Sequence, residues 1–336
     1  MPKKDHSAVK FQVAEALGEW MNVLFLKGVT DDEEYQAGFI HHMEADGMSA
    51  IKMIAEEEGL KVDSLPGLKS KSEPLFKIGA LLRYIKLTKK VNLSWLYKRK
   101  DQTGIPKHFV LVRIQGQNLQ AFYDKAKAMG VSPNSIMITA LDQATKSHLL
   151  GQDSARKWIL PLNMRPQEKA HLINGNYSAS IILNYKENHH YTSQETHQMI
   201  KSYLKNNIHW GSFLYSNMAR FIGFKGTLKV ARSIKEVGTG VFSNLGAWPG
   251  PYLEGKSDVK WRAVVAPSTQ ILPVAATAWH WKETLSLTLQ LHPSLNLPNE
   301  HMATQVMDEW LKLMGLKEGH KQVIAWSEFP NAPKTP

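Results

Sequence analysis

Cysteine is absent from all 336 residues of the chain. This absence excludes disulfide bonds, thiolate metal sites and a cysteine nucleophile, so any zinc site would have to consist of histidines and carboxylates. Long apolar runs are also missing, since Ile78–Ile85 and Ile271–Trp281 are shorter than the ~20 residues that a membrane-spanning helix needs. The start of the chain lacks the apolar segment and cleavage site of a secretory signal. We therefore expect a cytoplasmic protein.

The composition is that of a folded protein, with 43% hydrophobic and 21% charged residues. At ~150 residues per domain, this length predicts two lobes, each able to bury a core. The segment Lys98–Pro106 is charged and contains Gly and Pro, which is typical of a connection between lobes. We place an N-terminal lobe at residues 1–105 and a C-terminal lobe at residues 106–336.

Positive charge dominates, because 41 Lys and Arg face 30 Asp and Glu and leave a net charge of +11. Such an excess suits an anionic partner, which could be nucleic acid, a phosphorylated cofactor or an acidic membrane surface. The sequence shows no helix-turn-helix spacing, no RNP-type aromatic strand and no zinc finger, so we expect no nucleic-acid partner. One basic run stands out, and it comprises Arg220, Lys225, Lys229, Arg232 and Lys235.

Periodicity and capping signals predict alternating elements, and hence a mixed α and β fold. Helices are expected over Val9–Leu24, Met48–Glu58, Leu75–Leu87, Asn118–Met129, from Ser132 onward, and over Ser193–Asn206 and Asn299–Met314. Strands are expected over Tyr35–His41, His108–Ile114, Trp158–Leu162, Ser178–Tyr185, Gly240–Leu245, Trp261–Ala266, Pro273–Trp281 and Thr284–Leu291. Trp279 and Trp281 lie two residues apart on one strand face, which favours packing in the core.

The candidate site is a histidine pair at the junction of a predicted strand and helix. His41 and His42 are followed by Asp46 and Gly47 in the pattern H-H-x-x-x-D-G. A histidine held in one tautomer there could act as a general base, because its ordinary pKa lies near neutrality. Asp46 would need a cation if buried, and Gly47 would allow a tight turn. A satisfied core histidine is the alternative interpretation of His42. His189-His190 lacks the Asp and Gly, and we interpret it as a solvated loop.

This motif resembles the signature of the chloramphenicol acetyltransferase-like superfamily of CoA-dependent acyltransferases, which includes condensation domains and wax ester synthase/diacylglycerol acyltransferases. Further blocks are similar in the same order, namely Pro161 to Arg165, Gly175-Asn176-Tyr177 and Phe242 to Gly246. The lead-in from Glu19-Trp20 to Phe39-Ile40 is most similar to the wax ester synthase branch. The resemblance implies a two-lobed fold, with mixed sheets flanked by helices and an active-site channel between the lobes.

The resemblance also implies roles for single residues. His42 would be the base that removes the acceptor proton as the acceptor attacks the thioester of acyl-CoA. His41, Asp46, Gly47 and Arg165 would support the site, with Asp46 paired to Arg165. Ser243 or Asn244 would donate to the oxyanion or line the channel, although a simple polar strand end is the alternative for these two residues.

The implied reaction is transfer of an acyl group to a hydroxyl or amine by direct attack, with acyl-CoA as co-substrate, no permanently bound cofactor and no metal. Lys225, Lys229 and Arg232 would meet the CoA phosphates, unless they only form a solvated face. The acceptor would be an alcohol, a lipid or an amine, and an acyl carrier protein could replace CoA as the carrier of the donor. Peripheral membrane contact and self-association are further expectations.

One departure from the resemblance concerns the start of the chain. Superfamily members usually carry a much longer stretch before the histidine motif, whereas only 40 residues precede it here. We expect either that the N-terminal lobe is naturally shortened, which would leave a more open channel, or that the sequence is a fragment or has a variant start. The alternative function is a non-catalytic or carrier-protein-binding module that keeps the fold. A histidine metal site is disfavoured, because adjacent residues of a strand point to opposite faces.

Overall fold

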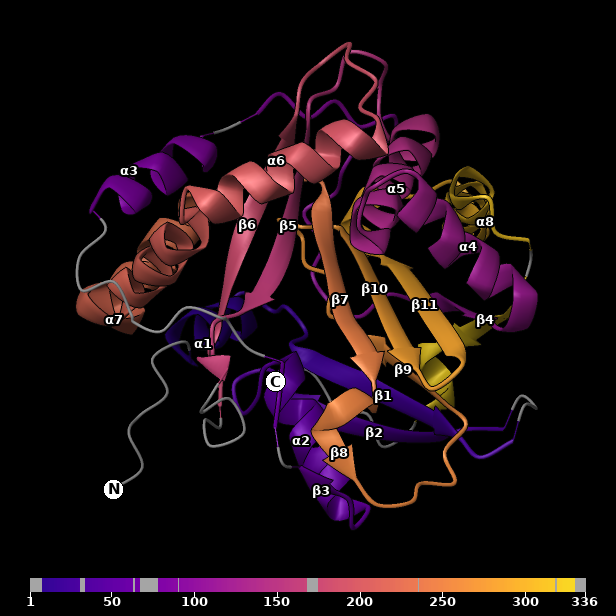
Figure 1. Ribbon diagram of the computed structural model, residues 1–336. Coiled ribbons are helices and arrows are strands. Elements are labelled where there is room, and N and C mark those ends of the chain that lie inside the picture. The colour runs from indigo at the N-terminus through magenta and orange to yellow at the C-terminus, as the bar shows by residue number, and fades with distance from the viewer. Residues whose placement is uncertain are drawn as a thin grey trace, which may run out of the picture.

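The computed structural model describes residues 8–30, 34–62, 64–66, 78–89, 91–167, 175–234, 236–317 and 319–329 (Figure 1). The helices are α1 (Ala8–Ala16), α2 (Gly47–Glu57), α3 (Ile78–Leu87), α4 (Gly116–Ala128), α5 (Pro133–Leu149), α6 (Ser193–Lys205), α7 (Ile208–Ser233) and α8 (Met302–Met314). The strands are β1 (Asn22–Gly28), β2 (Gln36–His41), β3 (Lys61–Val62), β4 (His108–Ile114), β5 (Arg156–Asn163), β6 (Ser178–Tyr185), β7 (Gly240–Trp248), β8 (Leu253–Glu254), β9 (Trp261–Val265), β10 (Val274–Trp281), β11 (Thr284–Leu291) and β12 (His320–Ala325).

Two main sheets form the framework. The larger has seven strands in the order β12-β4-β11-β10-β7-β5-β6, and the smaller has three in the order β2-β1-β9. Strand β7 runs parallel to β10 and to β5, whereas β10 and β11 form an antiparallel pair. The sheet is thus mixed, and the predicted mixed α and β fold class is confirmed.

Helices cover one face of the large sheet and the small sheet packs near the other (Figure 1). Residues of α4, α5 and α8 join β4, β10 and β11 in the largest buried apolar cluster. On the opposite side, the hydroxyls of Thr277 in β10 and Thr288 in β11 both donate to the carbonyl of Val264 in β9. Because both faces are covered, β11 is buried along its whole length although its residues alternate between polar side chains and leucine. The leucines join the helix-side cluster, whereas Thr288 and Gln290 on the other face bond to the carbonyls of Val264 and Ala266. Trp279 and Trp281 are buried in the core, as predicted.

The structure corrects one predicted helix near the N-terminus. Val9–Leu24 does not form one helix, because α1 ends at Ala16 and Asn22 already begins β1. Gly18, with a φ of 83°, lies in the turn between the two elements. The apolar run of β1 is central in its sheet, since β1 pairs with both β2 and β9. A continuous apolar run is compatible with either a buried strand or a helix, which is why composition alone misassigned it.

Other elements differ less from expectation. The sequence predicts no secondary structure for the basic segment from residue 218 to 235. In the structure, the described part of this segment belongs to the 26-residue helix α7. Gly223 bends this helix with a φ of 70°. Edge strand β12 was missed, because its three polar residues are followed by three apolar ones and do not alternate with them. Within the described parts of the chain, no helix is both long and apolar enough to cross a membrane.

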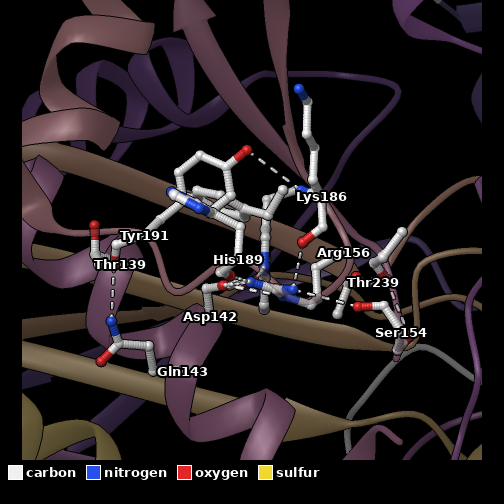
Figure 2. Close-up of polar contacts among 12 residues, drawn as sticks. Thr139, Asp142, Gln143, Ser154, Arg156, Lys186, His189, Tyr191 and Thr239 are labelled. Carbon is white, nitrogen blue, oxygen red and sulfur yellow. Dashed lines mark hydrogen bonds and ion pairs between the residues drawn. The ribbon is translucent and has the colours of Figure 1, made fainter. Parts of the chain in front are cut away.

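A buried ion pair joins α5 to β5 at one end of the large sheet (Figure 2). Arg156 Nη2 lies 3.1 Å from Asp142 Oδ2, and Trp158 Nε1 donates to Asp142 Oδ1 at 2.8 Å. The guanidinium also donates to the carbonyls of Lys186 and His189, at 2.9 Å and 3.2 Å. This network fixes the loop after β6 to the helix layer, and each partner compensates the desolvation of the other.

We expect Arg156→Met to lower the free energy of unfolding by ~3–5 kcal/mol, because Asp142 would remain buried without its cation. Urea denaturation followed by tryptophan fluorescence measures the change. The double variant Asp142→Leu/Arg156→Met removes both charges and should recover most of the loss. If Arg156→Met were as stable as the unmodified chain, the pair would not contribute as described.

Candidate functional site

The H-H-x-x-x-D-G motif forms the turn between β2 and α2. Strand β2 ends at His41, and α2 begins at Gly47. Asp46 is the N-cap of α2, and its side chain accepts a hydrogen bond of 3.0 Å from the backbone N–H of Ser49. A carboxylate at this position satisfies a free helix N–H and interacts favourably with the helix dipole. The motif thus specifies where the helix starts.

Asp46 also forms a buried, two-pronged ion pair with Arg165, which follows β5. Arg165 Nη1 lies 2.8 Å from Asp46 Oδ2, and Nη2 lies 3.0 Å from Oδ1. Both side chains are buried. Nη1 also donates to Asn163 Oδ1 at 3.0 Å, and Nη2 lies 2.6 Å from both Ser49 Oγ and the Gly175 carbonyl oxygen. The structure therefore contains the Asp46–Arg165 pair that the resemblance implied.

The Gly175-Asn176-Tyr177 segment holds the same turn from the other side. The side-chain amide of Asn176 donates to the carbonyls of His42 and Met43, at 2.7 Å and 3.2 Å. The backbone N–H of Tyr177 donates to Asp46 Oδ2 at 2.8 Å. Backbone groups next to His42 are therefore fixed by a segment more than a hundred residues later in the chain.

Gly47 has a different role from the one expected. Its φ is not in the left-handed region, so a tight turn does not require glycine here. A Cβ at this position would lie 2.8 Å from Cδ2 of Leu245 in β7, closer than side chains approach. The start of α2 thus packs directly against β7, and a larger residue at position 47 would require the end of the Leu245 side chain to shift.

His41 and His42 both contact helix α1, through residues one helical turn apart. Glu15 is hydrogen-bonded to His41 Nε2, and the Phe11 ring stacks on the His42 ring with 4.3 Å between centroids and 21° between planes. Because β2 ends at His41, the two rings do not separate to opposite faces of a strand as the spacing suggested. Helix α1 covers the histidine pair.

His42 lies in an apolar setting that disfavours its charged form. Burial, and secondly the positive charge of Lys10, lower the pKa of His42 from its ordinary value to about 4. Its Nδ1 is buried with no hydrogen-bond partner in the described structure, while the residue as a whole is half-buried. His42 is therefore neutral at pH 7, and proton exchange with a substrate would use Nε2.

Ser243 and Asn244 belong to β7 but face opposite sides of the sheet. Ser243 is in register with Thr277, whose hydroxyl binds the small sheet, so Ser243 faces the side of the small sheet. Asn244 Nδ2 instead lies 3.4 Å from Asn134 at the start of α5. Its Oδ1 accepts from the Gly246 N–H at 2.8 Å. Of these two residues, Ser243 is the one on the face of the large sheet that is turned toward the small sheet, and the histidine motif follows a strand of the small sheet.

A cavity of about 900 Å³ lies against another face of α1, between this helix and the C-terminal end of α7. Its lining includes five cationic and three acidic residues: Lys10, Lys98, Arg99, Lys100, Arg232, Glu19, Asp101 and Glu236. Arg99 is neutralised by Glu236 at 2.8 Å. Of the three predicted phosphate-binding residues, Arg232 lines this cavity, while Lys225 and Lys229 are exposed on α7 away from it.

Two members of the predicted basic run cannot be placed. Lys235 and the side chain of Arg220 lie outside the described residues. In the described part of the chain, no cluster of three or more His, Asp or Glu side chains could hold a metal ion. His189 lies on the surface and pairs with Glu195 at 2.9 Å, as its interpretation as a loop residue predicts.

Sequence reasoning missed several residues of the site. Phe11 and Glu15 carry no motif, and only the packing of α1 brings them to the histidines. Ser49 and Asn163 complete the polar shell of Arg165, but nothing in their spacing marks them. Asn176 was noted as part of a similar block, but its contact with the His42 carbonyl was not foreseen.

No family model matches the chain, and no curated protein matches it. Solved structures do match. A trichothecene 15-O-acetyltransferase from Fusarium sporotrichioides has a TM-score of 0.55 at 14% identity, over 88% of this chain and 70% of that one. The condensation domain of the monacolin K polyketide synthase has a TM-score of 0.54 at 12% identity, over 85% and 69%.

A wax ester synthase/diacylglycerol acyltransferase from Marinobacter aquaeolei has a TM-score of 0.50 at 15% identity, over 87% of this chain and 72% of that one. The chain therefore has the fold shared by these acyltransferases and condensation domains. The predicted chloramphenicol acetyltransferase-like fold is confirmed. At these identities the similarity shows the fold, and the activities stated for those proteins remain theirs.

We expect Asp46→Ala to destabilise the chain by ~3–5 kcal/mol, because Arg165 would remain buried without its carboxylate and α2 would lose its cap. Chemical denaturation measures this. Glu300→Ala is the matched control, since Glu300 pairs with Lys107 at 3.0 Å on the surface, and it should leave stability unchanged. Equal effects of the two substitutions would contradict the structural role of Asp46.

We expect Phe11→Ala to raise the pKa of His42 from about 4 toward its ordinary value, because the ring would gain water. Since the folded pKa lies below the unfolded one, His42 favours folding above pH ~6.5 and loses this contribution as pH falls toward 4. Histidine NMR titration measures the shift. His280, whose pKa is also lowered by burial, serves as the control and should not move.

Proposed function

We propose that this protein transfers an acyl group from acyl-CoA to a hydroxyl or amine acceptor, with His42 as the general base. The observation that carries this proposal is the double attachment of the His42 turn. Arg165 binds Asp46 on one side of it, and Asn176 binds the carbonyl of His42 itself. A histidine fixed through its own backbone is suited to meet a substrate in one orientation.

In this mechanism, Nε2 of neutral His42 accepts the proton of the acceptor as its oxygen or nitrogen attacks the thioester carbonyl. The new C–O or C–N bond forms a tetrahedral intermediate with negative charge on the former carbonyl oxygen. When the C–S bond breaks, the imidazolium returns the proton to the sulfur of CoA. The products are the ester or amide and free CoA, and no acyl-enzyme forms.

Ser243 is the oxyanion donor that we assign to this reaction, in preference to Asn244. It faces the small sheet, which carries the histidines, whereas the side chain of Asn244 is engaged by Asn134 and by the Gly246 N–H. A hydroxyl aimed at the developing negative charge stabilises the intermediate. Substitution of such a donor typically costs ~10²–10³ in rate.

The cavity beside α1 is the region that we assign to the donor. Arg232 and Lys100 are among the cations in its lining, which suits the phosphates of CoA. The same positive surface would suit the acidic surface of an acyl carrier protein. The carrier of the acyl group, CoA or protein, is resolved by offering both donors to the purified chain.

One contact favours a second function, a binding module without turnover. Phe11 lies on the His42 ring, and a base with a pKa of about 4 takes up protons weakly at pH 7. In this alternative the chain would bind the acyl donor without releasing CoA. Binding of acyl-CoA without acceptor-dependent release would assign the chain to this class.

We expect CoA release from long-chain and short-chain acyl-CoAs to depend on an added alcohol, diacylglycerol or amine, and to fall ~10²–10⁴-fold in His42→Ala. A thiol reagent reports only the freed CoA, because the chain has no cysteine. His189→Ala is the matched control, since His189 belongs to the other histidine pair and lies on the surface.

Two further substitutions distinguish the role of Ser243 from that of Asn244. Ser243→Ala should slow release more than Asn244→Ala. Folding of each variant is checked by its thermal transition. Release that is unchanged in His42→Ala would remove His42 as the base, and ester formation without CoA release would exclude the thioester donor.

A further inference from the structure

Helices α3 and α7 lie together at one edge of the molecule (Figure 1). Both helices expose large apolar side chains. Six of these side chains define what we call the α3–α7 surface: Ile78, Leu82, Ile85, Tyr215, Met218 and Ile222. Ile78 is 61% exposed, and Leu82 is 56% exposed. Single exposed apolar residues are ordinary, but a contiguous group over two packed helices indicates a contact surface.

The helices pack so that these side chains point to the same side. A Cβ on Gly211 of α7 would lie 2.2 Å from the Ala80 carbonyl of α3, so the helices meet there at close distance. Tyr215, Met218 and Ile222 follow Gly211 by four, seven and eleven residues, and therefore continue the face of α7 that points toward α3.

The apolar residues of α3 lie on its outer face. Leu82 is two residues after Ala80, and Ile78 is two residues before it, so both are on the side of α3 that points away from α7. The outer face of α3 therefore points in the same direction as the part of the α7 face that α3 does not cover. Phe221, 85% exposed, stands beside them just before the bend at Gly223.

The charges of the two helices have a single sign. Neither Ile78–Leu87 nor Ile208–Ser233 contains an aspartate or a glutamate. The exposed cations include Arg83 and Lys86 on α3 and Lys225 and Lys229 on α7. Apolar side chains flanked by lysine and arginine, without acidic residues, are the composition of helices that lie on anionic lipid surfaces.

We propose that the α3–α7 surface docks the protein onto an anionic lipid bilayer. The apolar side chains enter the headgroup boundary and the flanking cations contact the lipid phosphates. A second copy of the chain is a poorer occupant, because a two-fold contact through this surface would bring Arg83, Lys86 and Lys225 of both copies together.

The position of the surface relative to the histidines supports a lipid as the occupant. Phe224, directly after the bend, lines a shallow cavity of about 620 Å³ together with Gln12, Glu15 and Ala16 of α1. Glu15 is the residue bonded to His41. A bilayer docked on α7 would thus lie next to the helix that covers the candidate site.

Co-sedimentation with vesicles tests the proposal without measuring any catalysis. We expect the full chain to bind vesicles of phosphatidylcholine mixed with phosphatidylglycerol, and to bind phosphatidylcholine alone weakly. Raising the salt concentration should weaken the binding, because exposed charges are screened. In Leu82→Ser/Ile222→Ser the partition coefficient should fall by about tenfold or more. Lys86→Glu should reduce the preference for the anionic vesicles.

Val323→Ser is the matched control, since Val323 is 53% exposed on β12 and belongs to another part of the fold. It should bind vesicles as the unmodified chain does. Equal binding by Leu82→Ser/Ile222→Ser and the unmodified chain would overturn the proposal. So would a concentration-dependent dimer in lipid-free solution that the same double substitution abolishes, because the occupant would then be a second copy.

Discussion

The ion pair between Asp46 and Arg165 is the interaction on which the geometry of this molecule depends. One carboxylate starts α2, neutralises a buried guanidinium and receives the N–H of Tyr177. The two residues are 119 positions apart in the chain. Through them, the turn that carries His42 is attached to the end of β5 in the large sheet. A loss of either charge would leave the other buried, so position and stability of the histidine turn are coupled.

Helix α1 sets a second constraint, because its contact with the His42 ring keeps that ring ordered but makes His42 a weaker base. The Phe11 ring keeps water from His42 and the buried environment disfavours the imidazolium. A proton acceptor in catalysis needs the opposite, a site where the charge that develops is stabilised. In the reaction proposed above, the substrate or a displacement of α1 would have to supply that environment, and α1 would then take part in catalysis.

The sequence predicted correctly those features that depend on residues close together in the chain. Neighbouring residues determine the junction of strand and helix at His41–Gly47, the Ser132 cap of α5 and the burial of the tryptophans of β10. Arg165 was connected to Asp46 only through the resemblance, since no local pattern links residues so distant. The orientations of Ser243 and Asn244 required the register of β7 with β10. Composition could not separate α1 from β1, because both are largely apolar.

The small sheet is assembled from distant parts of the chain, and this has a consequence for its biosynthesis. Trp261 of β9 donates to the carbonyl of Thr30, 231 residues earlier. At translation rates of ~5–20 residues per second, β1 and β2 would wait on the order of 10–50 s for their third strand. A hairpin of β1 and β2 that formed during that time would expose an unpaired edge. Early binding by a holdase chaperone would protect that edge until β9 emerges.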